Sequence, residues 1–157
     1  DSACHLAEYS QRHHVPVHME GFGPSPFLTV DFLNEVARTF PCLRYCFDIG
    51  HMHIASQRDG FDLYNFARGL APNIGSVHVW NNRGIQDYFT YGHIPVHPIQ
   101  KPEDGWVDMA RILSTIVLNN PGCRVILESG SRYPQALGAH DFRDGVKWIK
   151  DLTAPLF

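Results

Sequence analysis

Four side chains that can bind a metal ion each stand at the end of a separate apolar segment. They are Glu20, Asp48, His78 and Glu128. The segments are short and rich in β-branched and aromatic residues, which predicts buried strands. Polar groups on the buried faces of parallel strands need a compensating partner, and a divalent cation can provide one. Three carboxylates and one imidazole suit Mn²⁺, Mg²⁺, Co²⁺ or Zn²⁺, so the sequence predicts one divalent metal ion as cofactor.

Asp48 is the residue around which the site is expected to form. It follows the apolar segment 43–47, and Gly50 and His51 come after it, so that a turn and an imidazole follow the carboxylate. The end of a strand is where ligands bind in α/β proteins. The residues leave a second interpretation open, in which Asp48 caps a helix and His51 is a loop histidine.

Strands and helices alternate along the sequence. Apolar segments predict strands at 15–20, 43–47, 74–80 and 123–128, and helical spacing predicts helices ending near 14 and spanning 30–40, 61–70, 106–117 and 142–152. Thr29 is a candidate N-cap and Pro41 a stop for the second helix. A long loop, expected from 81 to about 104, is of a length that is usually functional or disordered. The alternation argues for parallel βαβ units, so we predict an α/β fold in a single domain over residues 1–157.

Composition excludes some classes of protein. Hydrophobic residues are 44% and charged residues 18% of the chain, which is typical of a globular protein. Apolar runs stay short of the ~20 residues of a membrane span. A net charge of -3 without a dense Lys/Arg run argues weakly against nucleic acid as a partner. The four cysteines form no C-x-x-C pair, which predicts reduced thiols and a cytoplasmic location.

The segments at the strand ends resemble a known family. They are Val17-His18-Met19-Glu20, Phe47-Asp48-Ile49-Gly50-His51, Val77-His78-Val79-Trp80-Asn81-Asn82 and Val125-Ile126-Leu127-Glu128. Their order and the D-x-G-H step resemble the xylose-isomerase-like TIM barrels, which include sugar phosphate isomerases and epimerases, ketose 3-epimerases and endonuclease IV. Segments 93–96 and 104–108 resemble the family's H-x-P-x-G…G-x-I-D-W loop, although His97 and Pro98 stand where relatives often have glycine. The resemblance covers four strand–helix units, the C-terminal half of a (β/α)8 barrel.

The resemblance implies catalytic roles. In the epimerases, the residues that match Glu20, Asp48, His78 and Glu128 hold one divalent metal ion, and the two glutamates exchange protons with the substrate on opposite faces. Moving a proton next to a carbonyl generates an enediolate, and a metal ion bound to both oxygens stabilises its charge. One group must take the proton and another must return it. Glu20 and Glu128 are the expected pair because they follow the first and last strands.

Three other residues are expected to bind substrate. The position of His51 contacts a substrate oxygen in the family, and Arg83 is the candidate for an arginine that holds the carbonyl end. His93 lies in the long loop, where it could cover the site or face solvent, and the same alternatives hold for His97. Trp80 could form a wall for a sugar or serve only in packing.

The leading functional hypothesis is a metal-dependent isomerase or epimerase of a sugar, sugar phosphate or polyol. One alternative is a zinc-dependent phosphodiesterase resembling endonuclease IV. That site has an Asp-x-His pair in the long loop, where this chain has Tyr91-Gly92-His93. Another alternative is a half-barrel without catalytic activity of its own.

The edges of the expected sheet predict a partner. Four parallel strands cannot close a barrel of eight, so the strands of Glu20 and Glu128 would each have an unpaired edge. The inward face would also expose apolar side chains to water. The sequence begins without Met inside a helical pattern, which indicates a fragment or a processed chain. The expected companion is a missing N-terminal half-barrel or a second copy of this chain.

Overall fold

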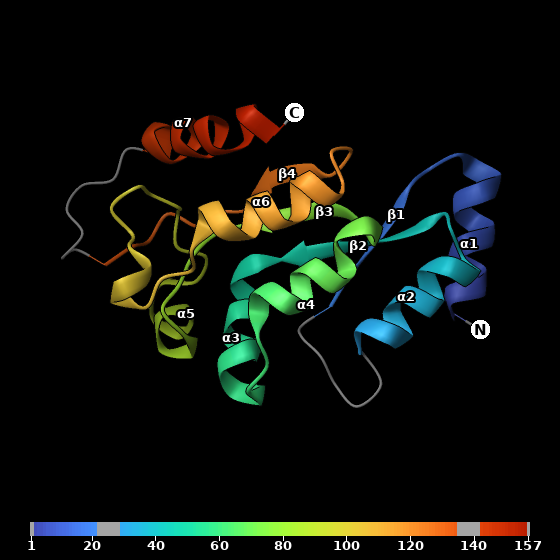
Figure 1. Ribbon diagram of the computed structural model, residues 1–157, viewed down its shortest axis with the longest axis horizontal. Helices are drawn as coiled ribbons and strands as arrows, with labels where there is room; N and C mark the ends of the chain where they lie inside the picture. The colour runs from blue at the N-terminus through green and yellow to red at the C-terminus, as the bar shows by residue number, and fades with distance from the viewer. Residues whose placement is uncertain (1, 22–28, 135–141, 157) are drawn as a thin grey trace.

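The computed structural model describes residues 2–21, 29–134 and 142–156. Helices and strands alternate along this part of the chain (Figure 1). The elements are α1 (Ser2–His13), β1 (Val17–Glu20), α2 (Val30–Thr39), β2 (Leu43–Asp48), α3 (Ile49–Asp59), α4 (Leu63–Leu70), β3 (Ile74–Val79), α5 (Ile85–Tyr91), α6 (Met109–Asn119), β4 (Arg124–Leu127) and α7 (Phe142–Thr153). Three short 3₁₀ helices are η1 (Ala71–Asn73), η2 (Pro102–Asp104) and η4 (Ala154–Leu156).

The strands form one parallel sheet in the order β1-β2-β3-β4. The register places Glu20 opposite Cys46 and Asp48 opposite His78. Since the neighbouring strands are parallel, the C-terminal ends of all four strands lie at the same end of the sheet. The predicted α/β fold of TIM-barrel-like units is confirmed. The extent of the domain, residues 1–157, stays a prediction.

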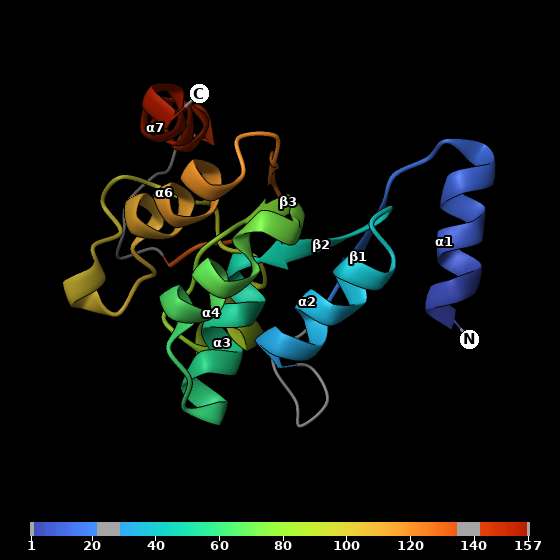
Figure 2. The same ribbon diagram turned by 45° about the vertical axis from the view of Figure 1, so that its right-hand side comes forward.

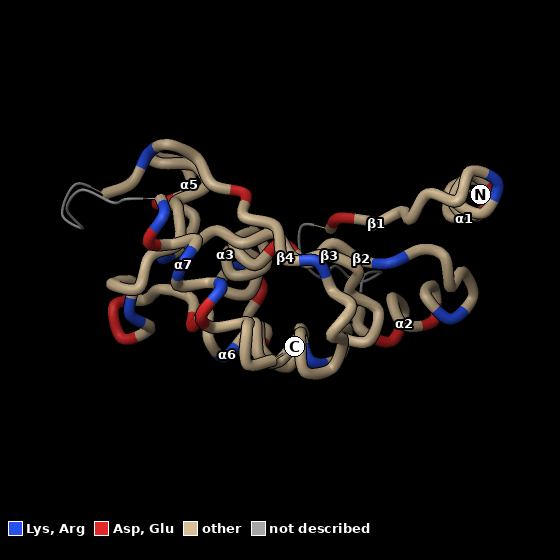
Figure 3. The backbone as a smooth tube through the Cα atoms, turned by 90° about the horizontal axis from the view of Figure 1, so that it is seen from above, with Lys and Arg blue, Asp and Glu red and all other residues tan. Residues whose placement is uncertain are grey.

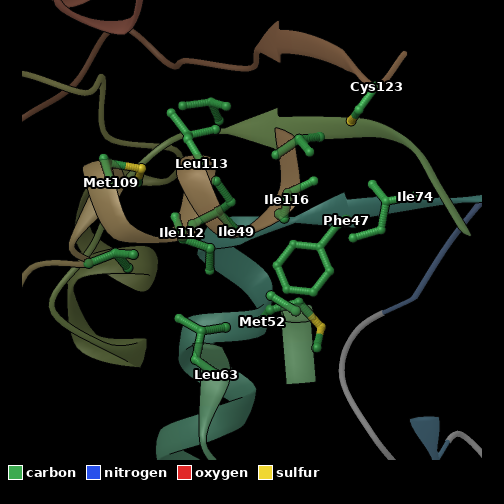
Figure 4. Packing of buried hydrophobic residues seen from close by; sticks show 14 of the residues in the cluster. Phe47, Ile49, Met52, Leu63, Ile74, Met109, Ile112, Leu113, Ile116 and Cys123 are labelled. Atoms are coloured by element: carbon green, nitrogen blue, oxygen red, sulfur yellow. The ribbon is translucent and has the colours of Figure 1, made fainter. Parts of the chain in front are cut away.

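Helices cover one face of the sheet, and this face is apolar. Figure 3 shows α2 and α6 on the same side of the strands. In Figure 4, Phe47 and Ile74 from the strands meet Met52 of α3 and Ile116 of α6, and all four side chains are buried. Burying a side chain of this size stabilises the fold by about 1.5–3 kcal/mol relative to leaving it exposed. This core fixes the strands whose ends carry the candidate ligands.

The opposite face of the sheet is more polar than the sequence analysis expected. Strand alternation puts His18, Cys46, Ser76 and Arg124 on this face, and His18 Nδ1 lies 2.9 Å from Ser76 Oγ in a hydrogen bond. Ile126 is the large aliphatic side chain here, with 43% of its surface exposed. The expected layer of exposed apolar residues is therefore reduced, in the described strands, to one prominent side chain.

Helix α3 begins directly after β2, where the sequence predicted a turn. Asp48 caps this helix, because its Oδ1 accepts a hydrogen bond of 2.7 Å from the backbone N–H of His51. Asp48 therefore does cap a helix, as one of the two interpretations of the sequence held, and His51 lies in that helix rather than in a loop. Gly50 is helical too, and a Cβ at this position would overlap the ring of Trp80. The glycine thus serves close packing and not a turn.

The long loop also contains structure that the sequence analysis missed. Helix α5 lies within it and ends at Tyr91, and its C-cap Gly92 has a φ of 74°. Helix α6 begins at Met109, three residues after the predicted start at Trp106. The reason is the cap: Asp108 Oδ1 accepts a hydrogen bond of 3.0 Å from the backbone N–H of Arg111. By contrast, the predicted cap Thr29 of α2 is confirmed by its bond from the Phe32 N–H.

Within the described residues, no helix combines the length and apolar character that a membrane crossing requires. Lys and Arg are dispersed along the backbone in Figure 3 rather than gathered in one patch. All four cysteines are free thiols. The cytoplasmic location, and the expectation that neither nucleic acid nor a membrane is a partner, stay predictions.

Candidate metal centre

The strand ends bring ligand atoms from four residues together. Glu20, Asp48, His78 and Glu128 each offer one atom, and these atoms all lie within 4.8 Å of one another. His78 Nδ1 is 2.7 Å from Glu128 Oε2, 3.7 Å from Asp48 Oδ2 and 3.8 Å from Glu20 Oε2. The convergence expected from the sequence is thus present in the structure. That the four residues bind a metal ion stays a prediction.

The spacing of these atoms suits a small divalent ion. With bonds of about 2.1 Å, an octahedral ion has adjacent ligand atoms about 3.0 Å apart and opposite ones about 4.2 Å apart. The three distances from His78 Nδ1 fall in or near this range. Three carboxylate oxygens and one imidazole nitrogen match the donor preferences of Mn²⁺, Mg²⁺, Co²⁺ and Zn²⁺.

Two of the ligand atoms lack any other partner. His78 Nδ1 and Glu128 Oε2 are buried and have no hydrogen-bond partner in the described part of the chain. The two atoms are close, but their geometry does not satisfy a hydrogen bond. Buried polar atoms are normally paired. A metal ion bound within the ligand group would satisfy both atoms, so the residues fit the predicted cofactor.

Asp48 is held more firmly than the other three ligands. Its side chain is fully buried, and Trp80 Nε1 donates to both of its oxygens, at 2.9 Å and 3.0 Å. Burial is the main cause that raises the pKa of Asp48 above its usual value, while the bonds from His51 and Trp80 act in the opposite direction. A bound cation would stabilise the ionised carboxylate. Asp48 is thus built as a fixed anchor that cannot swing toward a substrate.

An aromatic group forms one wall of the centre. The ring of His93 stacks on Trp80 with a centroid separation of 4.2 Å, and the ring of His51 makes edge contacts with Trp80, Tyr88 and His93. Burial lowers the pKa of His51, and the nearby His93 lowers it further. His51 is therefore neutral at pH 7, in a form that can accept as well as donate a hydrogen bond.

The three predicted substrate-binding residues lie in different surroundings. His51 is part of the aromatic wall, and His93 Nδ1 lies 3.5 Å from Glu128 Oε1. Arg83 instead pairs with Asp87, with Nε 2.8 Å from Oδ2, and its guanidinium lies over the ring of Trp106. The structure therefore brings His51 and His93 to the centre, whereas the contacts of Arg83 are made elsewhere. A binding role for any of the three stays a prediction.

Comparison with protein families adds one match. Residues 1–152 match the family described as xylose isomerase-like TIM barrel. The chain belongs to this family. A comparison with curated proteins found no match. Membership in the xylose isomerase-like TIM barrel family confirms the resemblance read from the strand ends. Since the family includes isomerases, epimerases and endonuclease IV-like enzymes, the match supports an enzyme with a divalent metal site and leaves the reaction open.

Two features of this xylose isomerase-like centre were not predicted from the sequence. One is Cys46, whose Sγ lies within 4.8 Å of ligand atoms of Glu20 and His78. Its position two residues before Asp48 on the same strand was a signal for a shared face. Burial raises the pKa of Cys46 to about 11, so it is a thiol at neutral pH. The other is the bond from Trp80 to Asp48, which joins residues 32 positions apart and has no local signature.

Replacing Trp80 with Phe should weaken metal binding by about 10- to 100-fold, as is typical when a residue that orients a ligand is lost. Phe keeps most of the packing against Gly50 but cannot donate to Asp48. Isothermal titration with Mn²⁺ would measure the change. Trp106→Phe, at another buried tryptophan, is the matched control and should leave the affinity unchanged. Equal affinities in the two variants would contradict an orienting role for the indole N–H.

Proposed function

We propose that this chain is the metal-binding half of a sugar isomerase or epimerase that acts by proton transfer next to a carbonyl group. The observation that carries the proposal is the difference in exposure among the three carboxylates. The side chain of Asp48 is 0% exposed, but those of Glu20 and Glu128 are 35% and 41% exposed. Two of the candidate ligands can therefore touch both the ion and a substrate, as a base and an acid must.

The two glutamates come from the two edge strands of the sheet, β1 and β4. Glu20 ends β1 and Glu128 follows β4, where its N–H bonds to the carbonyl of Val79 at 3.2 Å. One removes a proton from the carbon next to the carbonyl, and the other returns a proton to the enediolate. A bound divalent ion would stabilise the negative charge of that species. Asp48 and His78 would hold the ion, and neither is required to transfer a proton.

His93 has a positioning role in this scheme. Its Nδ1 lies 3.5 Å from Glu128 Oε1, the oxygen that is not directed at His78. Stacking on Trp80 fixes its ring plane. The contact leaves Glu128 with one oxygen toward the ligand group and one toward the histidine. It therefore limits the orientations in which this carboxylate can meet a substrate proton.

Solvent deuterium exchange tests the proposed reaction. The chain, loaded with Mn²⁺, Mg²⁺, Co²⁺ or Zn²⁺ in D₂O, should introduce deuterium next to the carbonyl of at least one ketose in a panel of free and phosphorylated sugars, as detected by NMR. EDTA should abolish the exchange. Exchange that persists in EDTA, or metal-dependent hydrolysis of a phosphodiester in place of exchange, would reject the proposal, the latter in favour of the endonuclease IV-like alternative.

We also propose that a second half-barrel pairs with this one, either an N-terminal half or another copy. In the described sheet, β1 bonds only to β2 and β4 only to β3. Exposed apolar side chains accompany both edges. They are Leu6 of α1 and Phe32 of α2, the helices that lie on either side of β1 in Figure 2, and Ile126 of β4. Free edges of parallel strands with apolar surface beside them favour pairing.

Analytical ultracentrifugation should detect this tendency. At micromolar concentration, the isolated chain is expected to sediment as a species larger than its 17.8 kDa monomer. Ile126→Lys, which places a charge on the open face of the edge strand β4, should shift the distribution toward monomer. A wild-type monomer with a cooperative thermal transition and no self-association would show that the edges are stable without a partner.

A further inference from the structure

A hollow beside Glu128 is lined by the loop that follows β4. It has a volume of about 330 Å³, at the lower end of the range of about 300–1,000 Å³ that is usual for ligand pockets. Glu128, one of the candidate metal ligands, and His93 line the hollow together with Ser129, Ser131 and Arg132. A molecule bound at the centre would therefore have room to extend toward these three residues.

A short backbone contact holds the two walls of the hollow together. The N–H of Gly130 donates to the carbonyl oxygen of His93 at 2.7 Å. A Cβ at Gly130 would lie 3.0 Å from that same oxygen, so only glycine allows the approach without displacement. This contact ties the loop after β4 to the loop after β3. It therefore fixes Ser129 and Ser131, the neighbours of Gly130, relative to Glu128.

Two hydrogen-bond donors that line the hollow have no partner among the described residues. Ser129 Oγ is buried and lacks a hydrogen-bond partner among the residues that the structure describes. Arg132 is exposed and makes no ion pair or hydrogen bond within the same set. Leaving a buried hydroxyl unpaired is unfavourable, so such groups usually have a function or a missing partner. A guanidinium and two hydroxyl groups are suited to a group with several acceptor oxygens.

We propose that this hollow binds the phosphate group of a phosphorylated sugar, with Arg132, Ser129 and Ser131 as its donors. The inference rests on the proposed function, since it names the class of substrate that the same site would take. Arg132 supplies the planar, bidentate recognition that phosphate favours. Arg83, which the sequence nominated for the carbonyl end of the substrate, is already paired with Asp87. The carboxylate of Glu128 opposes an anion here, so the phosphate site depends on a metal ion to offset that charge.

Binding measurements test the phosphate site without requiring turnover. In calorimetry with the Mn²⁺-loaded chain, a ketopentose 5-phosphate should bind about 10- to 100-fold more tightly than the same free ketopentose, the range expected for charge-assisted hydrogen bonds. Arg132→Gln should remove this preference, and Arg132→Lys should retain part of it. Arg68→Gln, on the exposed surface of α4, is the matched control and should leave the preference intact.

Ser129→Ala gives a second, independent readout. The variant should weaken phosphate binding several-fold, yet it should not lower the melting temperature of the ligand-free chain, because the hydroxyl has no protein partner to lose. A purely structural serine would lower the melting temperature when replaced.

Three results would overturn the phosphate site: equal binding of the phosphorylated and free sugars, a preference that survives Arg132→Gln, or a sugar carboxylate binding as tightly as the phosphate. Loss of the proposed function is distinguishable from these. A chain that binds phosphorylated sugars selectively but exchanges no deuterium keeps the phosphate site and rejects the reaction.

Discussion

Replacing Glu128 with Gln is expected to lower turnover by about a hundred- to ten-thousandfold, the usual contribution of a general acid or base. The amide keeps an oxygen that can reach the ion, but it can neither take nor return a proton. Metal affinity should fall less than turnover does, because Glu20, Asp48 and His78 remain. Deuterium exchange at saturating Mn²⁺ separates the two effects.

The control for this substitution is Glu103→Gln on the exposed helix η2. It makes the same chemical change at a residue outside the ligand group and should leave exchange unaltered. If Glu128→Gln exchanges protons as fast as the wild-type chain while binding Mn²⁺, then Glu128 is a ligand alone. Glu20 would in that case need another partner for the proton transfer.

Two substitutions of Asp48 should differ in their effect on the stability of the metal-free fold. Asp48→Ala removes the cap of α3 and leaves the buried N–H of Trp80 without an acceptor. We expect a loss of about 1 kcal/mol from the cap and about 1–3 kcal/mol from the unpaired donor. Asp48→Asn keeps an oxygen for both bonds. Because burial raises the pKa of Asp48, removing its charge should cost the metal-free protein little.

Thermal melts with and without metal give the readout. Binding of an ion to the folded state raises its stability in proportion to the logarithm of the ligand concentration. Wild-type chain should therefore melt at a higher temperature in Mn²⁺ than in EDTA, whereas both Asp48 variants should show little of this increase. In EDTA, only Asp48→Ala should melt well below wild type. A full metal-induced increase in Asp48→Asn would mean that the carboxylate charge is not needed for binding.

The parts of this structure that the sequence predicted follow from local patterns. Strands that end in a carboxylate or histidine, the helix of Val30–Thr39 and its Thr29 cap are all encoded within a few neighbouring residues. Chain order alone then placed the four ligands at the C-terminal end of the sheet, because successive parallel strands lie side by side. The pattern also indicated the family, which the match over residues 1–152 confirms.

The parts that were missed depend on contacts between distant segments. Helix α3 has few periodic apolar residues, and it forms because Asp48 caps it and Trp80 packs on Gly50. Helix α5 has no buried residue among its seven, so the usual apolar stripe that predicts a helix is absent. Arg83 was nominated by its distance in sequence from His78, which cannot reveal that Asp87, one helical turn later, would bind it.

The arrangement of helices around the sheet sets the composition of any partner that closes it. In the described residues, α2, α4 and α6 each connect two strands, α1 precedes β1 and α7 follows β4. By chain order, these five helices account for the three grooves between neighbouring strands and for the one groove beyond each free edge. An eight-stranded barrel has eight such grooves. A complementary unit must then supply four strands with only three helices, beginning and ending in a strand. Two identical copies would bring ten helices to eight grooves, so a symmetric pair could close only by displacing α1 or α7 from each copy.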